Sequence, residues 1–223
     1  MIGISIATKW EWEAALEYFS KNKSECENYP FGEFFKMNLA DKELIFYVTN
    51  TRKVNSAAAN QYMICKYDLE KIIVIGTCAG IDDAYENLDI IIPKRAVQYD
   101  CTVKEIEPLI KQSFAVDIDL DNLDFEYNTG TIGTADKAVV MWKDYLELKG
   151  NGITIADTEA AGVAYVCKQN GIKCFIIKGI SDFPQNEDYM DKQERNAEQI
   201  NVYLENTPKV MKRILEDYLE KLI

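Results

Sequence analysis

The strongest constraint on the fold is the run Lys71-Ile-Ile-Val-Ile-Gly-Thr-Cys-Ala-Gly80, in which β-branched and small side chains follow Lys71 without another charged residue. A strand with one solvated face alternates apolar and polar residues, whereas a strand buried on both faces is continuously apolar. The run therefore predicts a central strand that is covered on both sides. Its end consists of small residues, which allow close approach by a backbone or a ligand.

The rest of the chain alternates between strand and helix patterns. Strand patterns cover residues 2–7, 34–39, 43–49, 88–93, 95–99, 131–134, 153–156 and 173–180. Helix patterns begin at Trp10 and cover residues 54–67 and 159–170. Gly171 predicts the end of the last of these helices. Asn206 and Pro208 predict the N-cap and first turn of a C-terminal helix. Residues 104–128 give mixed signals. The alternation predicts an α/β fold, and without a linker or repeat we expect one domain over residues 1–223.

The net charge of the chain limits which classes of partner it can bind. The 25 Lys and Arg residues against 37 Asp and Glu residues give a net charge of −12. Phosphate backbones and anionic membranes repel such a chain, so we expect a small-molecule partner, with no nucleic acid and no membrane. The six scattered cysteines form no C-x-x-C pair, and no signal peptide precedes the first strand, which favours a cytoplasmic protein.

The chain contains no histidine. A Ser-His-Asp or Cys-His relay is therefore excluded, and the commonest metal ligand is missing. Acid–base chemistry must come from carboxylates, Lys, Tyr or Cys. Two carboxylates in unlike environments can divide these roles, one protonated and one ionised.

Four carboxylates stand just after predicted strands, at Glu11, Asp136, Glu159 and Asp182. Ligands of open α/β sheets bind beyond the carboxyl ends of the strands, so these four are candidates for one site. Each also has a structural interpretation, as a helix-terminal acid, a capping or turn residue, or a solvated side chain. The small residues from Gly76 to Gly80 can likewise serve a ligand or close helix packing. Cys78 has no histidine to activate it and is a poor nucleophile.

The order of these segments resembles the nucleoside phosphorylase/nucleosidase superfamily, and most closely its methylthioadenosine/adenosylhomocysteine nucleosidase branch. The similarity extends from Ile2 to the C-terminal helix. It rests on Ile2-Gly-Ile4 with Ala7 and Glu11, Ile75-Gly-Thr-Cys-Ala-Gly80, Thr134-Ala-Asp136, Asp157-Thr-Glu-Ala-Ala161 with Val166-Cys167, and Ile180-Ser-Asp182. The Gly-Asp-Pro phosphate loop with which phosphorylases usually open is absent.

The resemblance implies a three-layer α/β/α sandwich with a central mixed sheet, no metal or cofactor, a homodimer, and cleavage of the N-ribosidic bond of a purine nucleoside. Asp182 would be the general acid that protonates the base, and Glu11 would activate the attacking water. Glu159 would hold the ribose hydroxyls. Further substrate contacts are implied for Thr77, Cys78, Ala79, Asp136, Lys137, Ala138, Thr158 and Ser181.

Several positions depart from the nucleosidase pattern. Asn50-Thr51-Arg52-Lys53 stands where Gly-Ile-Gly-Lys is usual, Thr158 replaces a methionine under the ribose, and Lys178 replaces an arginine. Lys137-Ala138 stands where an aromatic residue normally stacks on adenine. Lost contacts of this kind are each worth about 1–3 kcal/mol, so the substrate can differ from methylthioadenosine.

Arg52 and Lys53 are also candidates for binding an anion, either phosphate or a phosphorylated sugar. Their presence leaves open the alternative that the chain is a phosphate-dependent purine or uridine nucleoside phosphorylase. Against that alternative, Val74 stands where the phosphorylase branch has a phosphate-binding arginine. A third alternative is an inactive nucleoside-binding or storage homologue, which the presence of Glu11, Glu159 and Asp182 together disfavours.

Overall fold

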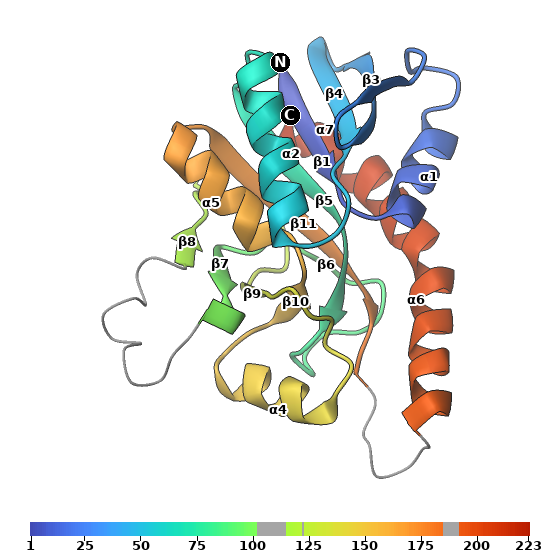
Figure 1. Ribbon diagram of the computed structural model, residues 1–223, viewed down its shortest axis with the longest axis vertical. Helices are drawn as coiled ribbons and strands as arrows, with labels where there is room; N and C mark the ends of the chain where they lie inside the picture. Colours follow the sequence, from blue (N-terminus) through green and yellow to red (C-terminus); the bar gives the residue numbers. More distant parts are fainter. Residues whose placement is uncertain (102–114, 122, 185–191) are drawn as a thin grey trace.

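The protein has an α/β fold built on one mixed sheet. The computed structural model describes residues 1–101, 115–121, 123–184 and 192–223, and in these residues the strands form a single sheet (Figure 1). β1 (Ile2–Ile6) lies between β4 (Lys42–Val48) and β5 (Lys71–Gly80) and is parallel to both. β11 (Lys173–Asp182) also runs parallel to β5. The carboxyl ends of these four strands therefore meet at one edge of the sheet.

Antiparallel pairs make the sheet mixed. β3 (Gly32–Leu39) forms a hairpin with β4, where strands were expected over residues 34–39 and 43–49, and its turn uses positive φ values at Ala40 and Asp41. The remaining strands are β2 (Glu27–Tyr29), β6 (Ile90–Ile91), β7 (Arg95–Gln98), β8 (Ala115–Asp117), β9 (Thr131–Thr134) and β10 (Ile155–Asp157). β10 pairs antiparallel with the end of β5 and parallel with β9.

Helices cover both faces of this sheet, which gives the expected three layers (Figure 1). α2 (Lys53–Lys66) and α5 (Ala160–Asn170) lie together on one face, and α1 (Lys9–Tyr18) and α6 (Lys192–Arg213) on the other. The remaining helical elements are α4 (Trp142–Gly150), a 3₁₀ turn (Tyr99–Cys101), a π-helical turn (Ile214–Tyr218) and α7 (Leu219–Leu222).

The two faces of β5 enter different parts of the core. Ile73 and Ile75 pack in the cluster that includes side chains of α1 and α6, while Ile72 and Val74 pack in the cluster beneath α2 and α5. All four are at most 2% exposed. The prediction of a central strand buried on both faces is confirmed.

Local residues define two helix ends. The stop at Gly171 was predicted and is confirmed, whereas the cap at Thr8 was not predicted. Thr8 is the N-cap of α1, where its hydroxyl accepts a hydrogen bond from the backbone N–H of Glu11 and the Glu11 carboxylate accepts one from the N–H of Thr8. This reciprocal pair is a capping box. Gly171 ends α5 in a left-handed conformation, with φ of 67°, that glycine adopts without steric cost.

The predicted start of the C-terminal helix at Asn206 and Pro208 is wrong. Helix α6 is continuous from Lys192 to Arg213, and Pro208 lies inside it. A proline in a helix removes one N–H donor and crowds the carbonyl four residues earlier, so other contacts must hold the helix together at that point. The Thr207 hydroxyl donates to the Tyr203 carbonyl at 2.7 Å, and the Asn206 side chain donates to the Ser181 carbonyl at 2.8 Å. Asn206 therefore joins the helix to β11 instead of capping it.

Two other segments differ from the sequence pattern. The strand expected over residues 88–93 is only Ile90–Ile91, because Leu88 has a left-handed φ of 76° and Pro93 has no N–H for a further pair. Of the ambiguous segment 104–128, the structure describes a short strand, β8, and the residues that follow it except 122. Residues 104–114 lie outside the described residues.

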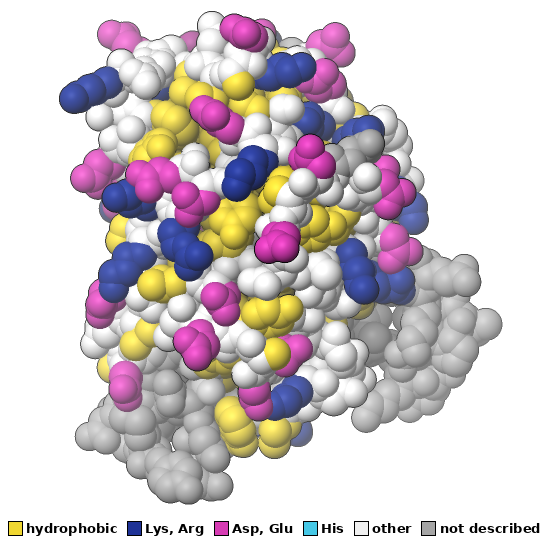
Figure 2. Space-filling model, turned by 180° about the vertical axis from the view of Figure 1, so that it is seen from behind, with side chains coloured by type: hydrophobic (Ala, Val, Ile, Leu, Met, Phe, Trp, Pro, Cys, Tyr) yellow, Lys and Arg dark blue, Asp and Glu magenta, His cyan; other side chains and the backbone are white. Residues whose placement is uncertain are grey.

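The surface is mixed in charge. On the face shown in Figure 2, Asp and Glu side chains are spread among Lys and Arg side chains without one dominant basic area. Among the helices of the described segments, none is both long enough and apolar enough to span a bilayer.

Gly76 lets α1 approach β5. Its φ is 151°, and a Cβ atom at this position would lie 2.5 Å from Oε1 of Glu11. Such a distance is far below van der Waals contact, and the neighbouring atoms belong to a buried carboxylate. The glycine is therefore required both by its backbone conformation and by the space that Glu11 fills.

We expect Gly76→Ala to lower the free energy of unfolding by about 1–3 kcal/mol, because the side chain strains the backbone and displaces Glu11. Gly150→Ala is the matched control, since no heavy atom lies within 4 Å of its added Cβ. Urea unfolding of both variants measures the difference. Equal midpoints for Gly76→Ala and the unsubstituted protein would contradict this account.

Candidate active site

A cavity of about 390 Å³ opens where the parallel strands end. The ends of β1, β5, β10 and β11 form its floor, and α6 contributes one wall. It is lined by Thr8, Trp10, Glu11, Thr51, Arg52, Thr77, Cys78, Ala79, Ala138, Val139, Val140, Ala156, Asp157, Thr158, Glu159, Ser181, Asp182, Gln199, Ile200 and Tyr203. This is the edge at which an open α/β sheet binds ligands.

Glu11 is held between α1 and β5. Its side chain is 1% exposed, and Oε1 accepts hydrogen bonds from the Thr77 backbone N–H at 2.6 Å and the Thr77 hydroxyl at 2.7 Å. Oε2 accepts from the backbone N–H of Thr8 at 2.9 Å. Three donors thus fix the carboxylate in one orientation at the cavity wall.

Asp182 ends β11 on the cavity. Oδ1 accepts from the Ser181 hydroxyl at 2.6 Å, and Oδ2 accepts from Nε2 of Gln199 at 2.7 Å. Burial raises the pKa of Asp182, while these two hydrogen bonds act in the opposite direction. The result is a carboxyl group that holds a proton more tightly than an exposed aspartate.

Glu159 stands between β10 and α5. Oε1 accepts from the backbone N–H of Arg52 at 2.8 Å and from the hydroxyl of Thr158. Burial, followed by the nearby charge of Asp157, raises the pKa of Glu159 to about 7, although Lys178 and the two hydrogen bonds oppose the shift. At neutral pH the group is therefore only partly ionised, and in either form it can accept a hydrogen bond from a ligand hydroxyl.

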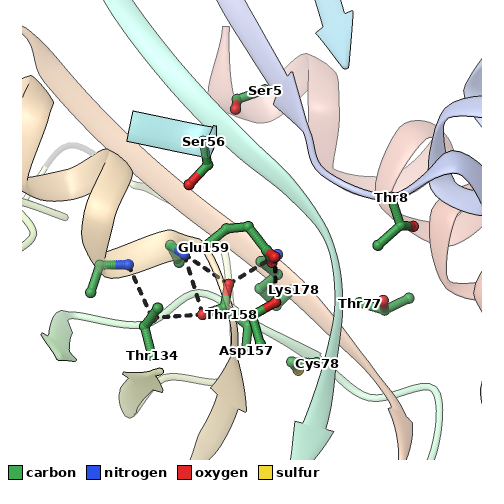
Figure 3. A network of polar contacts seen from close by, with 12 residues as sticks. Ser5, Thr8, Ser56, Thr77, Cys78, Thr134, Asp157, Thr158, Glu159 and Lys178 are labelled. Carbon is green, nitrogen blue, oxygen red and sulfur yellow. Dashed lines mark hydrogen bonds and ion pairs between the residues drawn. The ribbon is translucent and has the colours of Figure 1, made fainter. Parts of the chain in front are cut away.

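Beneath the cavity lies a buried ion pair between Lys178 and Asp157. Nζ of Lys178 is 3.2 Å from Oδ2 of Asp157, and the two side chains are 1% and 2% exposed. Asp157 also accepts from the Thr134 hydroxyl at 2.6 Å and from the Ala160 N–H at 2.9 Å (Figure 3). Burial opposes the charge on Lys178, but the carboxylates around it, Asp157 foremost, raise its pKa above the usual value.

Apolar side chains form the rest of the wall. Ala138, Val139 and Val140 lie on one side, and Ile200 and other α6 residues on another. Trp10 and Tyr203 meet edge to face, with ring centroids 5.8 Å apart. A ligand of this cavity therefore contacts both carboxylates and apolar surface.

Most of the residues expected to form the site line this one cavity. They are Glu11, Arg52, Thr77, Cys78, Ala79, Ala138, Thr158, Glu159, Ser181 and Asp182. The structure thus brings together the ends of three strands and the start of α2. Cys78 is buried, which raises the pKa of its thiol and agrees with its interpretation as a poor nucleophile.

Asp136, Lys137 and Lys53 do not line the cavity. Nζ of Lys53 lies 2.5 Å from Oδ1 of Asp100, and the Lys53 backbone N–H donates to Asp136 at 2.9 Å. Lys137 pairs with Asp144 at 2.9 Å. The expected anion-binding role of Lys53 and the substrate contacts of Asp136 and Lys137 are not supported, because these charges are satisfied by neighbouring residues outside the cavity.

The sequence reasoning missed the contribution of α6. Gln199, Tyr203 and Asn206 recur at helical spacing and share a face, which is the signal that was available. The expected helix start at Asn206 concealed it. Nε2 of Gln199 contacts Asp182, and the Tyr203 hydroxyl donates to Oγ1 of Thr8 at 3.3 Å. Helix α6 thus supports two of the strand ends.

The arrangement can perform acid–base chemistry at a bond placed between opposing carboxylates. Asp182, whose pKa is raised, could donate a proton, and Glu11 and Glu159 could act as acceptors. Within the part of the chain that the structure describes, no group of three or more Cys, Asp or Glu side chains is placed to hold a metal ion.

Known proteins share this fold and much of this sequence pattern. A 5′-methylthioadenosine/S-adenosylhomocysteine nucleosidase from Bacillus cytotoxicus is 24% identical over 201 residues, covering 82% of this chain and 87% of that protein. An aminodeoxyfutalosine nucleosidase from Helicobacter pylori is 24% identical and covers 99% of both chains.

Solved structures agree on the fold. The Helicobacter pylori 5′-methylthioadenosine/S-adenosylhomocysteine nucleosidase superposes with a TM-score of 0.78 at 20% identity and 97% coverage of both chains. A putative enzyme of the same name from Francisella philomiragia gives 0.80 at 19% identity, with 99% of this chain and 97% of that chain covered. The model of the phosphorylase superfamily matches residues 1–216. This chain therefore belongs to the phosphorylase superfamily.

Proposed function

We propose that this chain is a nucleosidase, an N-ribosyl hydrolase that cleaves the N-glycosidic bond of a purine nucleoside. The observation that carries the proposal is the meeting of Glu11, Glu159 and Asp182 around one cavity, each buried and each held by hydrogen-bond donors. The nucleosidase names of the relatives from Bacillus cytotoxicus and Helicobacter pylori support the same reaction class.

Asp182 acts as the general acid. Its raised pKa keeps more of the carboxyl protonated near neutral pH than in an exposed aspartate. The proton passes to a ring nitrogen of the purine while the bond between C1′ and the base breaks. The electron pair of that bond goes to the base, which leaves as a neutral purine.

Glu11 and Glu159 act on the sugar. Glu11 takes a proton from the water that attacks C1′, and Glu159 accepts hydrogen bonds from the ribose hydroxyls. The ribose becomes cationic and oxocarbenium-like as the base departs. The ionised form of a carboxyl group beside the sugar stabilises this developing charge, and electrostatic stabilisation of this kind is usually the largest catalytic contribution. With a pKa of about 7, Glu159 is partly ionised at neutral pH.

Two features favour water over phosphate as the nucleophile. Val74, at the position of the phosphate-binding arginine in the phosphorylase branch, is 2% exposed and packed in the core beneath α2 and α5. Lys53 is neutralised by Asp100. The phosphorylase alternative therefore depends on Arg52 alone among the residues that the sequence singled out for an anion.

Other features of the proposal rest on resemblance. We propose a homodimer located in the cytoplasm, and we treat residues 1–223 as one domain. The substrate class follows the names of the relatives, and an adenine base fits between Asp182 and the aliphatic wall of Ala138, Val139 and Val140. This wall offers apolar contact without an aromatic ring.

The decisive assay incubates the protein with methylthioadenosine, adenosylhomocysteine, aminodeoxyfutalosine, adenosine, inosine, guanosine and uridine, with and without phosphate. We expect release of free base and free sugar from an adenine nucleoside without phosphate. A strict requirement for phosphate, with sugar phosphate as product, would identify a phosphorylase. Tight binding without release from any nucleoside would identify a binding homologue.

Asp182→Asn removes the proton donor and little volume, so we expect kcat/KM to fall about 10²–10⁴-fold while the fold is retained. Base release measures the rate, and circular dichroism with a thermal melt measures the fold. Asp68→Asn, at an exposed position far from the cavity, is the control. If Asp182→Asn has the same kcat/KM as the unsubstituted protein, Asp182 is not the general acid.

Gln199 sets the pH range of the acid. Its amide donates to Oδ2 of Asp182 and thereby stabilises the ionised form, which lowers the pKa of Asp182. Activity requires the protonated form, so it is lost as pH rises through this pKa. In Gln199→Met the donor is gone, the pKa rises, and the alkaline limb of kcat/KM against pH moves to higher pH.

The measurement is the pH profile rather than the rate at one pH, because the substitution also changes the cavity wall. Glu198→Gln, at the adjacent exposed position of α6, serves as the control. An alkaline limb that stays in place or moves to lower pH in Gln199→Met would show that Gln199 does not act on Asp182.

A further inference from the structure

Arg52 has an unusual backbone. It precedes α2 with φ of 84° and ψ of 156°, and its side chain makes no capping hydrogen bond. A positive φ is unfavourable for a residue with a Cβ atom, and such conformations cluster at ligand-binding sites. The Arg52 N–H donates to Oε1 of Glu159 at 2.8 Å. The strained residue is thus fixed directly beside a carboxylate of the cavity.

The charge of Arg52 is unpaired. Arg52 is exposed and lines the cavity, and within the described residues no acidic side chain forms an ion pair with its guanidinium. The two other cations near this edge are satisfied, Lys53 by Asp100 and Lys178 by Asp157. Among the side chains that the structure describes, Arg52 is therefore the lining cation left available to a ligand.

The position of Arg52 assigns it to one end of the ligand. Asp182 marks the end of the cavity that holds the base, and Glu159 marks the ribose. Because the backbone N–H of Arg52 donates to Glu159 and Arg52 lines the cavity, residue 52 stands beside the carboxylate assigned to the ribose. Asp157 is paired with Lys178, but Glu11, Glu159 and Asp182 also line the cavity, and the ionised form of each repels an anionic ligand. Such a ligand therefore needs a cation there.

We propose that Arg52 forms an anion subsite for a carboxylate or phosphate group at the ribose end of the ligand. This inference rests on the proposed nucleosidase function and names its substrate class, a nucleoside with an acidic group on its 5′ substituent. A planar guanidinium suits both kinds of oxyanion through paired N–H donors. Free inorganic phosphate has the same chemistry and is the other source that the test must separate.

The test uses a matched pair of 5′-alkylthioadenosines, one ending in a carboxylate and the other in its methyl ester. The ratio of kcat/KM for the acid to that for the ester is measured in the unsubstituted protein and in Arg52→Gln. We expect the ratio to fall about tenfold or more in Arg52→Gln, because a hydrogen bond to a charged group is lost. Lys66→Gln removes the same charge at the other end of α2 and should leave the ratio unchanged.

Arg52→Gly separates loss of the cation from loss of the fold. Glycine accepts the positive φ and keeps the backbone N–H that bonds Glu159, so we expect a melting temperature no lower than that of the unsubstituted protein. Its ratio of acid to ester should fall as in Arg52→Gln. An unchanged ratio in both variants would overturn the proposal.

Calorimetric titration of the same pair keeps the test independent of turnover. If neither compound is cleaved, the nucleosidase proposal fails. The anion subsite is then tested by binding alone: weaker binding of the acid relative to the ester in Arg52→Gln supports it, and unchanged relative binding overturns it. Inorganic phosphate is added in a separate arm. Phosphate-dependent cleavage of the ester that Arg52→Gln abolishes would support the subsite with free phosphate as its ligand.

Discussion

The ion pair between Lys178 and Asp157 allows several acids to be buried at one edge of the sheet. Its two charges lie 3.2 Å apart with almost no solvent access, and Glu11 and Glu159 add to the field around the lysine. Without a buried cation, the repulsion among these carboxylates would favour protonation of more than one. Removing one partner of such a pair costs about 3–5 kcal/mol, because the other charge stays buried. The pair joins β11 to the end of β10, so it also fixes where α5 begins.

The electrostatics of the cavity follow from which donors reach each carboxylate. Glu11 has three donors from rigid backbone and a buried hydroxyl, which suits an acceptor held in place. Asp182 has two side-chain donors, and burial still raises its pKa, which suits a proton donor. The same residue type thus takes different roles through its surroundings alone. No histidine is needed for this division.

The strained loop before α2 shows how substrate specificity can change while the arrangement of strands and helices stays the same. Arg52 and Lys53 are adjacent cations, yet the structure neutralises one and leaves the other at the cavity. Asn50 and Arg52 both adopt positive φ values at positions where the resemblance has glycine. The Asn50 amide donates to the Phe31 carbonyl at 2.7 Å and Asn50 does not line the cavity, whereas Arg52 does. The conformational cost at Arg52 therefore agrees with its proposed role in ligand binding. The chemistry of bond cleavage and the recognition of the ribose end are separate features of this site.

The sequence by itself determined the strands and helices whose pattern is local, including the doubly buried β5, the two strands of the hairpin and the stop at Gly171. It also placed Glu11 and Asp182 just after β1 and β11, parallel strands whose carboxyl ends meet. Glu159 follows β10, and its arrival at the same cavity depends on the antiparallel pairing of β10 with the end of β5, which the sequence did not indicate. Only the tertiary structure decided that α6 runs through Pro208 and carries Gln199 to Asp182, that Lys53 and Lys137 are paired away from the cavity, and that Lys178 lies beneath it. Periodicity and capping depend on residues close in the chain, whereas burial, charge pairing and pKa depend on contacts between segments that folding brings together.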